Sequence, residues 1–167
     1  ARYDGYSMKV FTLEKDRDNS LSTSDLILYE DKRKILWVGS LAGLNKFNRE
    51  NETFKLYSSI QEDSTTINSN LVRSFCEDKQ GRFWIGTQVG LNLLDRDNEI
   101  FTQFYFRNED VQLNESLNPD QTYLCVNCVI EDPSSGDLFI GTEKNGLWIF
   151  NVTEKTFSKH SPDNLDK

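Results

Sequence analysis

The chain has few of the residues on which catalytic and metal sites are built. Its 167 residues include one histidine, three cysteines, three prolines and one methionine. A histidine-based triad or metal site needs partners of defined geometry, whereas His160 stands between Lys159 and Ser161 with no paired nucleophile. We therefore expect no catalytic residue, no metal site and no cofactor, and we expect His160 at an exposed strand end.

The three cysteines are too few and too scattered for a disulfide framework. Cys125 and Cys128 have the spacing of a CxxC motif, but a strand places residues three apart on opposite faces. Cys76 and Cys128 lie in the first strands of adjacent repeats and could approach each other. Buried thiols that pack as small apolar side chains are the favoured interpretation.

Long apolar runs and basic clusters are also missing. No run approaches the about 20 apolar residues that a membrane span needs, so we expect no membrane insertion of this segment. The sequence has no signal peptide, and because it opens in the middle of a repeat this does not bear on the compartment. The formal net charge is −8 with no basic stripe, which argues against nucleic acid as a partner.

What the chain does contain is the same pattern three times, at residues 28–57, 75–105 and 129–157. Each copy carries a Glu-Asp pair, an aromatic-aliphatic-Gly step, a Gly-Leu step and a closing aromatic residue in the same order. A period of this size is typical of stacked-repeat and propeller folds. The third copy begins later than the first interval predicts, because extra residues lie in the connection around 106–121.

Within each copy the local signals are those of strands. Apolar residues alternate with polar ones between turns rich in Asp, Asn and Gly, and no segment keeps a period of 3.6 residues. The predicted strands are 24–31, 35–40, 43–48 and 52–58, then 70–78, 82–87, 90–95 and 99–106, then 122–132, 137–142, 146–151 and 155–160.

These units predict an all-β fold, a partial β-propeller of about three and a half four-stranded antiparallel blades. At the N-terminus, Arg2 to Asp4 match Lys46 to Asn48, and Phe11 to Leu13 match Phe54 to Leu56. The predicted parts are residues 1–22 (half a blade and a connector), 23–69 (blade 1), 70–121 (blade 2 and a long connector) and 122–167 (blade 3). A closed ring needs at least about four blades, so we expect a fragment of a larger propeller, or a piece that self-associates.

Repetition also indicates what the prominent side chains do. Aromatic residues recur at equivalent positions, which favours packing between blades over a stacking platform for a sugar or base. The Glu-Asp pairs occur in every copy, so the Asp is expected to cap a turn, because catalysis needs one such site rather than three. The D-x-D-N segments 16–19 and 95–98 lack the rest of a calcium loop, and turns are favoured there. The aromatic residues are Trp37, Trp84 and Phe139, and Phe54, Phe101 and Phe157; the pairs are Glu30-Asp31, Glu77-Asp78 and Glu131-Asp132.

Residues Glu77 to Thr87, followed by Gly90-Leu91-Asn92, closely resemble the two-component regulator propeller repeat. The resemblance extends over essentially the whole chain in three tandem copies, which makes it specific. The chain departs from the repeat where Lys34 replaces the turn glycine, where Phe139 replaces tryptophan and where Leu147-Trp148 replaces Leu-Asn. A blade can absorb such changes.

The resemblance implies a role that the residues alone do not. Such repeats typically form seven-bladed propellers in the periplasmic sensor region of hybrid two-component histidine kinases. These are inner-membrane proteins, and their ligands are often oligosaccharides. The resemblance therefore implies a periplasmic, glycan-recognising segment that takes part in signal transduction and phosphorelay. The phosphotransfer histidine and the kinase domains would lie outside this chain, which is then itself no enzyme.

Ligand contacts are expected on one face, from the connections 14–23, 58–69 and 106–121 and from the hairpin loops 40–43, 87–90 and 142–146. Planar polar side chains suit a ligand rich in hydroxyl groups, and Tyr105, Phe106 or Tyr123 could stack on a sugar ring. A plain hydrophilic connector explains the same composition and is favoured over a ligand-binding role. The candidate ligand-binding residues are Tyr105, Asn108, Asp110, Asn114, Asn118, Asp120 and Tyr123.

Two other functions stay open. A structural propeller could pass on a signal by dimerising through its blade edges, without touching a ligand. A propeller lyase or glycosidase would need acid and base residues clustered near a central channel, which the sequence does not offer outside the turn pairs. Fold alone does not decide among them.

Overall fold

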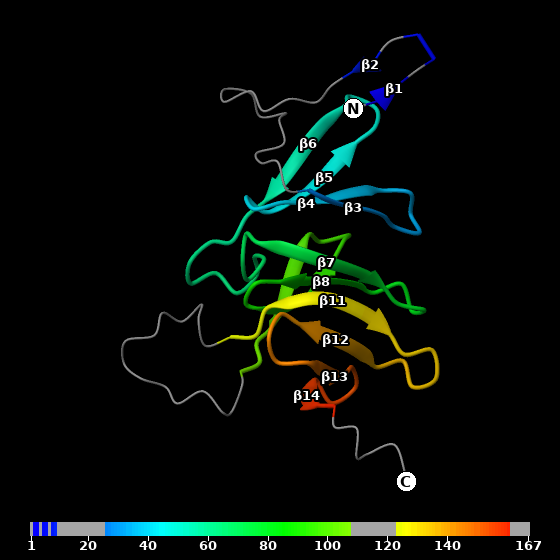
Figure 1. Ribbon diagram of the computed structural model, residues 1–167. Coiled ribbons are helices and arrows are strands. Elements are labelled where there is room, and N and C mark those ends of the chain that lie inside the picture. The colour runs from blue at the N-terminus through cyan, green and yellow to red at the C-terminus, as the bar shows by residue number, and fades with distance from the viewer. Residues whose placement is uncertain (1, 4, 7, 10–25, 108–122, 161–167) are drawn as a thin grey trace.

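Three four-stranded antiparallel sheets make up the computed structural model, which describes residues 2–3, 5–6, 8–9, 26–107 and 123–160. The sheets follow one another along the chain and stack face to face, as Figure 1 shows from β3 through β7 to β14. The described residues contain no helix, and so none that could cross a bilayer. The predicted all-β fold of successive propeller blades is confirmed.

Each sheet is a meander in which consecutive strands pair. The predicted strands coincide with the observed ones and exceed them by a few residues at the ends. Blade 1 contains β3 (Ile27–Glu30), β4 (Leu36–Gly39), β5 (Leu44–Asn48) and β6 (Thr53–Tyr57). Blade 2 contains β7 (Val72–Glu77), β8 (Phe83–Thr87), β9 (Gly90–Asp95) and β10 (Ile100–Phe104). Blade 3 contains β11 (Val126–Glu131), β12 (Leu138–Thr142), β13 (Leu147–Asn151) and β14 (Thr156–Lys159).

The structure describes the N-terminal hairpin only in part. Strand β1 (Arg2–Tyr3) pairs with β2 (Met8–Lys9), so that Tyr3 lies opposite Met8. The expected partner strand at Phe11 to Leu13 lies outside the described residues. Between the two strands, Gly5 has a φ of 99°, a left-handed conformation that glycine adopts without steric cost.

Aromatic side chains fill the space between blades, as predicted. Trp37 of blade 1 is 1% exposed and lies 5.2 Å from the ring of Phe83 in blade 2. Trp84 of blade 2 is equally buried and meets Phe150 of blade 3 edge-on at 5.6 Å. Phe139, which takes the place of tryptophan in blade 3, is only half-buried. The side of blade 3 that faces away from blade 2 is thus less covered.

The Glu-Asp pairs make turns, and the aspartate does more than the sequence indicated. In blade 1 the Asp31 carboxylate accepts the Ile35 N–H at 2.9 Å and the Trp37 indole N–H at 2.9 Å. In blade 2, Asp78 accepts the Arg82 N–H at 2.8 Å and the Trp84 indole at 2.8 Å. The aspartate therefore closes the first hairpin and also fixes the tryptophan that packs against the next blade.

The residue after each aspartate joins its blade to the next. The Lys32 N–H donates to the Glu77 carboxylate at 2.6 Å, and its Nζ donates to the Asp78 carbonyl at 2.7 Å. One blade later the Lys79 N–H makes the equivalent bond to the Glu131 carboxylate at 3.0 Å, and its Nζ donates to the Pro133 carbonyl at 2.6 Å, one residue beyond the equivalent aspartate. The equivalent residue in blade 3 is Pro133, which has no N–H to give. In blades 1 and 2 the Glu-Asp-Lys segment thus takes part in bonds to the neighbouring blade. Blade 3 has Pro133 in place of the lysine and cannot make these bonds to a further blade.

Burial alone would raise the pKa of Asp31, but hydrogen bonds from Trp37, the Ile35 N–H and Arg96 outweigh it and hold that pKa below its ordinary value. Because the unfolded chain regains the ordinary pKa near 4, this carboxylate stabilises the fold fully above about pH 4 and loses its effect as pH falls. We expect Asp31→Asn to flatten the acid side of the stability profile, measured as urea midpoints from pH 6 to pH 3. An unchanged slope would contradict this role; Glu154→Gln, at an exposed turn, is the control.

The three cysteines differ in burial. Burial raises the pKa of the Cys76 and Cys125 thiols, which favours the protonated, unreactive form. Cys76 packs against the apolar core between blades 2 and 3, as the buried-thiol interpretation predicts. Cys128 is exposed, and all three are free thiols in this structure.

Candidate functional site

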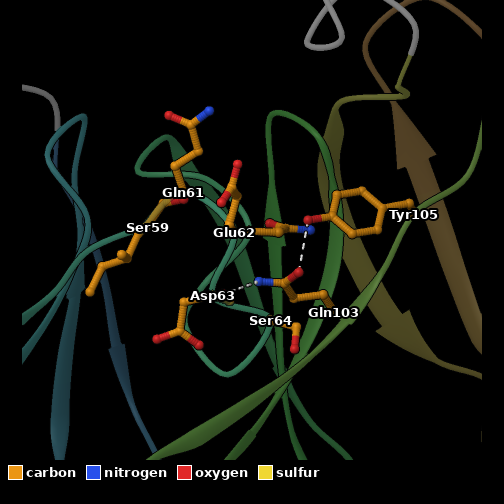
Figure 2. A pocket seen from close by; sticks show the side chains of 9 residues that line it. Ser59, Gln61, Glu62, Asp63, Ser64, Gln103 and Tyr105 are labelled. Atoms are coloured by element: carbon orange, nitrogen blue, oxygen red, sulfur yellow. Dashed lines mark hydrogen bonds between the residues drawn. The ribbon is translucent and has the colours of Figure 1, made fainter.

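The connection between blades 1 and 2 folds into a pocket on the face where the sequence places ligand contacts. We call it the connection pocket; its volume is about 310 Å³. The loop from β6 to β7 forms one side and the end of β10 the other, as Figure 2 shows. It is lined by Ser59, Ile60, Gln61, Glu62, Asp63, Ser64, Asn68, Gln103 and Tyr105.

Local hydrogen bonds give the loop its shape. One Asp63 carboxylate oxygen accepts both the N–H and the hydroxyl of Thr65, at 2.9 and 2.6 Å, in a turn typical of aspartate. These bonds hold the pKa of Asp63 below its ordinary value, so the carboxylate is ionised at neutral pH. The Ile60 N–H donates to the Thr66 hydroxyl at 3.1 Å and closes the loop.

The loop is fixed to blade 2 at two points. The Phe101 N–H donates to the Thr65 carbonyl at 2.9 Å, and the Gln103 side-chain amide donates to the Thr66 carbonyl at 2.7 Å. Fully buried Ile67 anchors the loop in the core between blades 1 and 2. The pocket wall is therefore a fixed part of the propeller.

Asn68 connects the pocket to the centre of blade 2. Its side-chain oxygen accepts from Asn92 at 2.7 Å and from the Thr87 hydroxyl at 2.6 Å, while its own N–H donates to Asn92 at 2.9 Å. Asn92 is the polar residue of the Gly-Leu-Asn step. The repeat motif thus places an asparagine where it orders the connection that precedes the same blade.

Aromatic residues border the pocket on the side of the long connector. Tyr105, 43% exposed, donates its hydroxyl to the Gln103 side chain at 2.8 Å. Its ring lies 4.9 Å from that of Tyr123, centroid to centroid. The Arg107 guanidinium covers the Tyr123 ring, with its Cζ 4.7 Å from the ring centroid, and donates to the Tyr123 hydroxyl at 2.8 Å. These contacts bring together two of the predicted site residues, Tyr105 and Tyr123.

The other predicted ligand-binding residues are either outside the described residues or buried. Asn108, Asp110, Asn114, Asn118 and Asp120 lie outside the described residues, as does the connection 14–23 for all of its length. Phe106, considered for sugar stacking, is 5% exposed and stacks on Phe157 at 4.1 Å, so that expectation was wrong. Its apolar ring completes the core between blades 2 and 3. His160 is half-buried, and its N–H donates to the Leu147 carbonyl at 2.9 Å.

Three lining residues, Glu62, Asp63 and Gln103, are not among those predicted individually from the sequence. The loop 58–69 was named as a candidate, but nothing in its polar composition shows which side chains turn inward. A signal was present at Gln103, which replaces the apolar or charged residue expected on an outer strand and faces the loop across the sheet edge.

A second cavity, of about 230 Å³, lies at the opposite, turn end of blade 2, beside Arg33, Arg82 and Arg96. Its arginine side chains already have carboxylate partners within the protein. Arg33 forms a two-pronged bond with Asp97, and Arg96 bonds Asp31 at 2.7 Å. Because these side chains already have partners, few charged groups of the cavity are free to contact a ligand. Among the described residues no group of three His, Cys, Asp or Glu side chains could hold a metal ion.

Comparisons with known proteins address the fold and the repeat. Residues 66–88 match the family model described as two component regulator propeller. No curated protein matches the chain. Among solved structures, the extracellular domain of the hybrid two-component system protein BT4673 from B. thetaiotaomicron is similar with a TM-score of 0.65 and 23% identity. This match covers 89% of the present chain and 18% of the other.

Two further structures carry the same fold. The extracellular domain of BT3049, a hybrid two-component system protein of the same organism, has a TM-score of 0.52 at 22% identity, over 89% of this chain and 25% of that one. PorZ, a surface component of the type-IX secretion system of Porphyromonas gingivalis, has a TM-score of 0.57 at 16% identity, over 88% and 22%. The chain thus spans only about a fifth of the length of the solved structures it resembles. Residues 66–88 thus match a two-component regulator propeller repeat, and the chain around them folds as successive four-stranded propeller blades.

Proposed function

We propose that this chain is an extracytoplasmic, periplasmic segment of a hybrid two-component sensor histidine kinase, and that it recognises a glycan in the connection pocket. The observation that carries the proposal is the propeller repeat at residues 66–88, because it contains the end of the very loop that lines the pocket. Two of the similar solved structures are extracellular domains of hybrid two-component systems. Because these similar regions are extracellular, the kinase domains of such a system would lie outside this chain.

The chemistry of the pocket suits a ligand rich in hydroxyl groups. Serine, glutamine, asparagine and carboxylate side chains offer acceptors and donors at fixed positions, and the exposed face of Tyr105 lies beside them. Sugar rings combine polar edges with an apolar face, and sites of this composition bind both. An oligosaccharide would extend from the polar loop across Tyr105 toward Tyr123 and Arg107.

Binding of an oligosaccharide panel to the chain, followed by titration calorimetry, tests the proposal. We expect Tyr105→Ala to weaken the best ligand about tenfold, since an aromatic contact contributes about 1.4 kcal/mol. Tyr105→Phe keeps the ring but loses the hydroxyl that holds Gln103, and is expected to lose less. If no oligosaccharide of the panel binds, or if both variants lose affinity equally, glycan stacking at Tyr105 is contradicted.

A propeller that transmits a signal by self-association is the second candidate. Leu28 on blade 1 and Ile130 on blade 3 are 65% and 58% exposed, on the sides of these sheets that face away from blade 2. Apolar side chains in such positions favour contact with a further blade or a second molecule. Concentration-dependent sedimentation that Ile130→Glu abolishes, with no glycan bound, would favour this candidate instead.

A further inference from the structure

The charges in the connection pocket limit the class of ligand that it can bind. They can be judged from which of its polar groups already have partners within the protein. Gln103 is engaged at both ends, donating to the Thr66 carbonyl at 2.7 Å and accepting from Tyr105 at 2.8 Å. The Tyr105 hydroxyl hydrogen is engaged by the same contact. Two conspicuous donors of the pocket are thus occupied within the protein.

One donor of the lining, the buried Asn68 side-chain nitrogen, has no partner in the described part of the chain, but the charged groups of the pocket are acceptors and they too are free. Glu62 is exposed, and among the described residues its carboxylate has no hydrogen-bond or ion-pair partner. Its φ of 67° is a left-handed conformation that is uncommon for a residue with a side chain and costs conformational energy. Asp63 uses one carboxylate oxygen on Thr65, and its second oxygen has no partner among the described residues.

No positive side chain offsets these carboxylates in the pocket. Neither lysine, arginine nor histidine is among its lining residues. The positive group nearest in the chain to its aromatic side, Arg107, covers Tyr123 instead. The formal charge of the whole chain, −8, adds to the negative potential. A ligand in this pocket meets two carboxylates and must bring hydrogen-bond donors to them.

We infer that the connection pocket binds saccharides that are uncharged or carry an amine, and that it rejects saccharides bearing carboxylate or sulfate groups. Hydroxyl and ammonium groups donate to Glu62 and to the free Asp63 oxygen, whereas an anionic sugar places like charge against both. This inference rests on the proposed glycan recognition and names the ligand class of the same site.

The test compares oligosaccharides that share one backbone and differ in charge. β-1,4-linked glucose oligomers, their 2-amino derivatives and their 6-carboxylate derivatives form one such set, and the ligand found by panel screening, with its oxidised and aminated forms, gives a second. We expect the carboxylate form to bind at least about tenfold more weakly than the neutral form, and the amine form at least as tightly. Adding salt should narrow the difference, because salt screens exposed charges.

Glu62→Gln is the matched variant, because it removes the charge and keeps the size of the side chain. We expect it to reduce the discrimination against the carboxylate form at least threefold. Glu154→Gln changes the net charge equally at an exposed turn of blade 3 and serves as the control. Nuclear magnetic resonance shifts of the Gln103 side-chain amide show whether a sugar occupies the pocket.

Each outcome decides. Carboxylate forms that bind as tightly as neutral ones overturn the inference while glycan recognition stands. Equal effects of Glu62→Gln and Glu154→Gln also overturn it, since the overall charge would then act rather than the pocket. Sugars that bind without shifting the Gln103 amide place the site elsewhere. If no sugar binds in either set, the proposed function falls together with the inference.

Discussion

Arg96→Ala is expected to lower the free energy of unfolding by about 3–5 kcal/mol, as removal of one partner from a buried ion pair does. The Arg96 side chain is 4% exposed although it lies in the turn between β9 and β10. It donates to Asp31 of blade 1 at 2.7 Å and to Glu77 of its own blade at 2.8 Å. Without it two carboxylates, 0% and 2% exposed, would face each other with no cation between them.

Arg49 provides a matched control. It occupies the equivalent turn of blade 1 and bonds Glu30 at 2.6 Å, but its side chain is 57% exposed. Exposed pairs contribute at most about 1 kcal/mol, so Arg49→Ala should change the urea midpoint little. Equal losses in the two variants would mean that burial of the Arg96 cluster contributes nothing special. Arg96→Met, which retains bulk, separates the loss of charge from the loss of packing.

The structure also shows why this cluster is not repeated one blade later. The residue equivalent to Arg96 in blade 3 is Val152, which packs against the core between blades 2 and 3. The Asp78 carboxylate is instead paired within its own blade, by the Arg82 Nε at 2.5 Å. The same buried aspartate is therefore neutralised from the following blade at one interface and from its own hairpin at the next.

Much of the fold was predictable because each blade repeats its own local signals. The Glu-Asp turn, the buried aromatic residue and the Gly-Leu step set the strand positions, and three copies removed the ambiguity of any single one. Phe139 illustrates the limit. Repetition predicted a core position, but the burial of a side chain depends on what covers it, and nothing among the described residues covers that side of blade 3.

The candidate site was less predictable for a related reason. Tyr105 and Tyr123 are separated by a long connector, and only the fold brings their rings within 4.9 Å. Arg96 read as an ordinary turn residue, because charged residues in turns are commonly exposed. Its burial follows from the distance between two blades, which local patterns do not encode. Glu62 was equally hidden, since its left-handed backbone is a property of the folded loop.

Gly90→Ala is expected to lower the free energy of unfolding by about 3 kcal/mol. The cause of this loss is backbone geometry rather than charge. Gly90 has a φ of 141°, in the region that favours glycine, and a Cβ there would overlap the Phe104 carbonyl oxygen. The carbonyl belongs to the paired outer strand β10 and cannot rotate away without breaking the sheet. Gly43 of blade 1 has the same geometry, with a φ of 136° and the Tyr57 carbonyl in the same place. In blades 1 and 2 the Gly-Leu step is therefore a close approach of two strands, whereas a Cβ at Gly146 of blade 3 would meet nothing within 4 Å.

Gly81→Ala separates the two contributions to that cost. Gly81 has a φ of 78°, but a Cβ there would meet nothing within 4 Å. It should lose only the conformational part, about 1–2 kcal/mol, in urea unfolding. The excess at Gly90 then measures the contact with β10, and it should appear together with weakened amide protection of Phe104 and Leu91 in hydrogen exchange. Equal losses at Gly81 and Gly90 would mean that β10 moves aside freely. In that case the Gly-Leu step reflects turn conformation alone, and the strand spacing inside each blade is not what fixes glycine at this position.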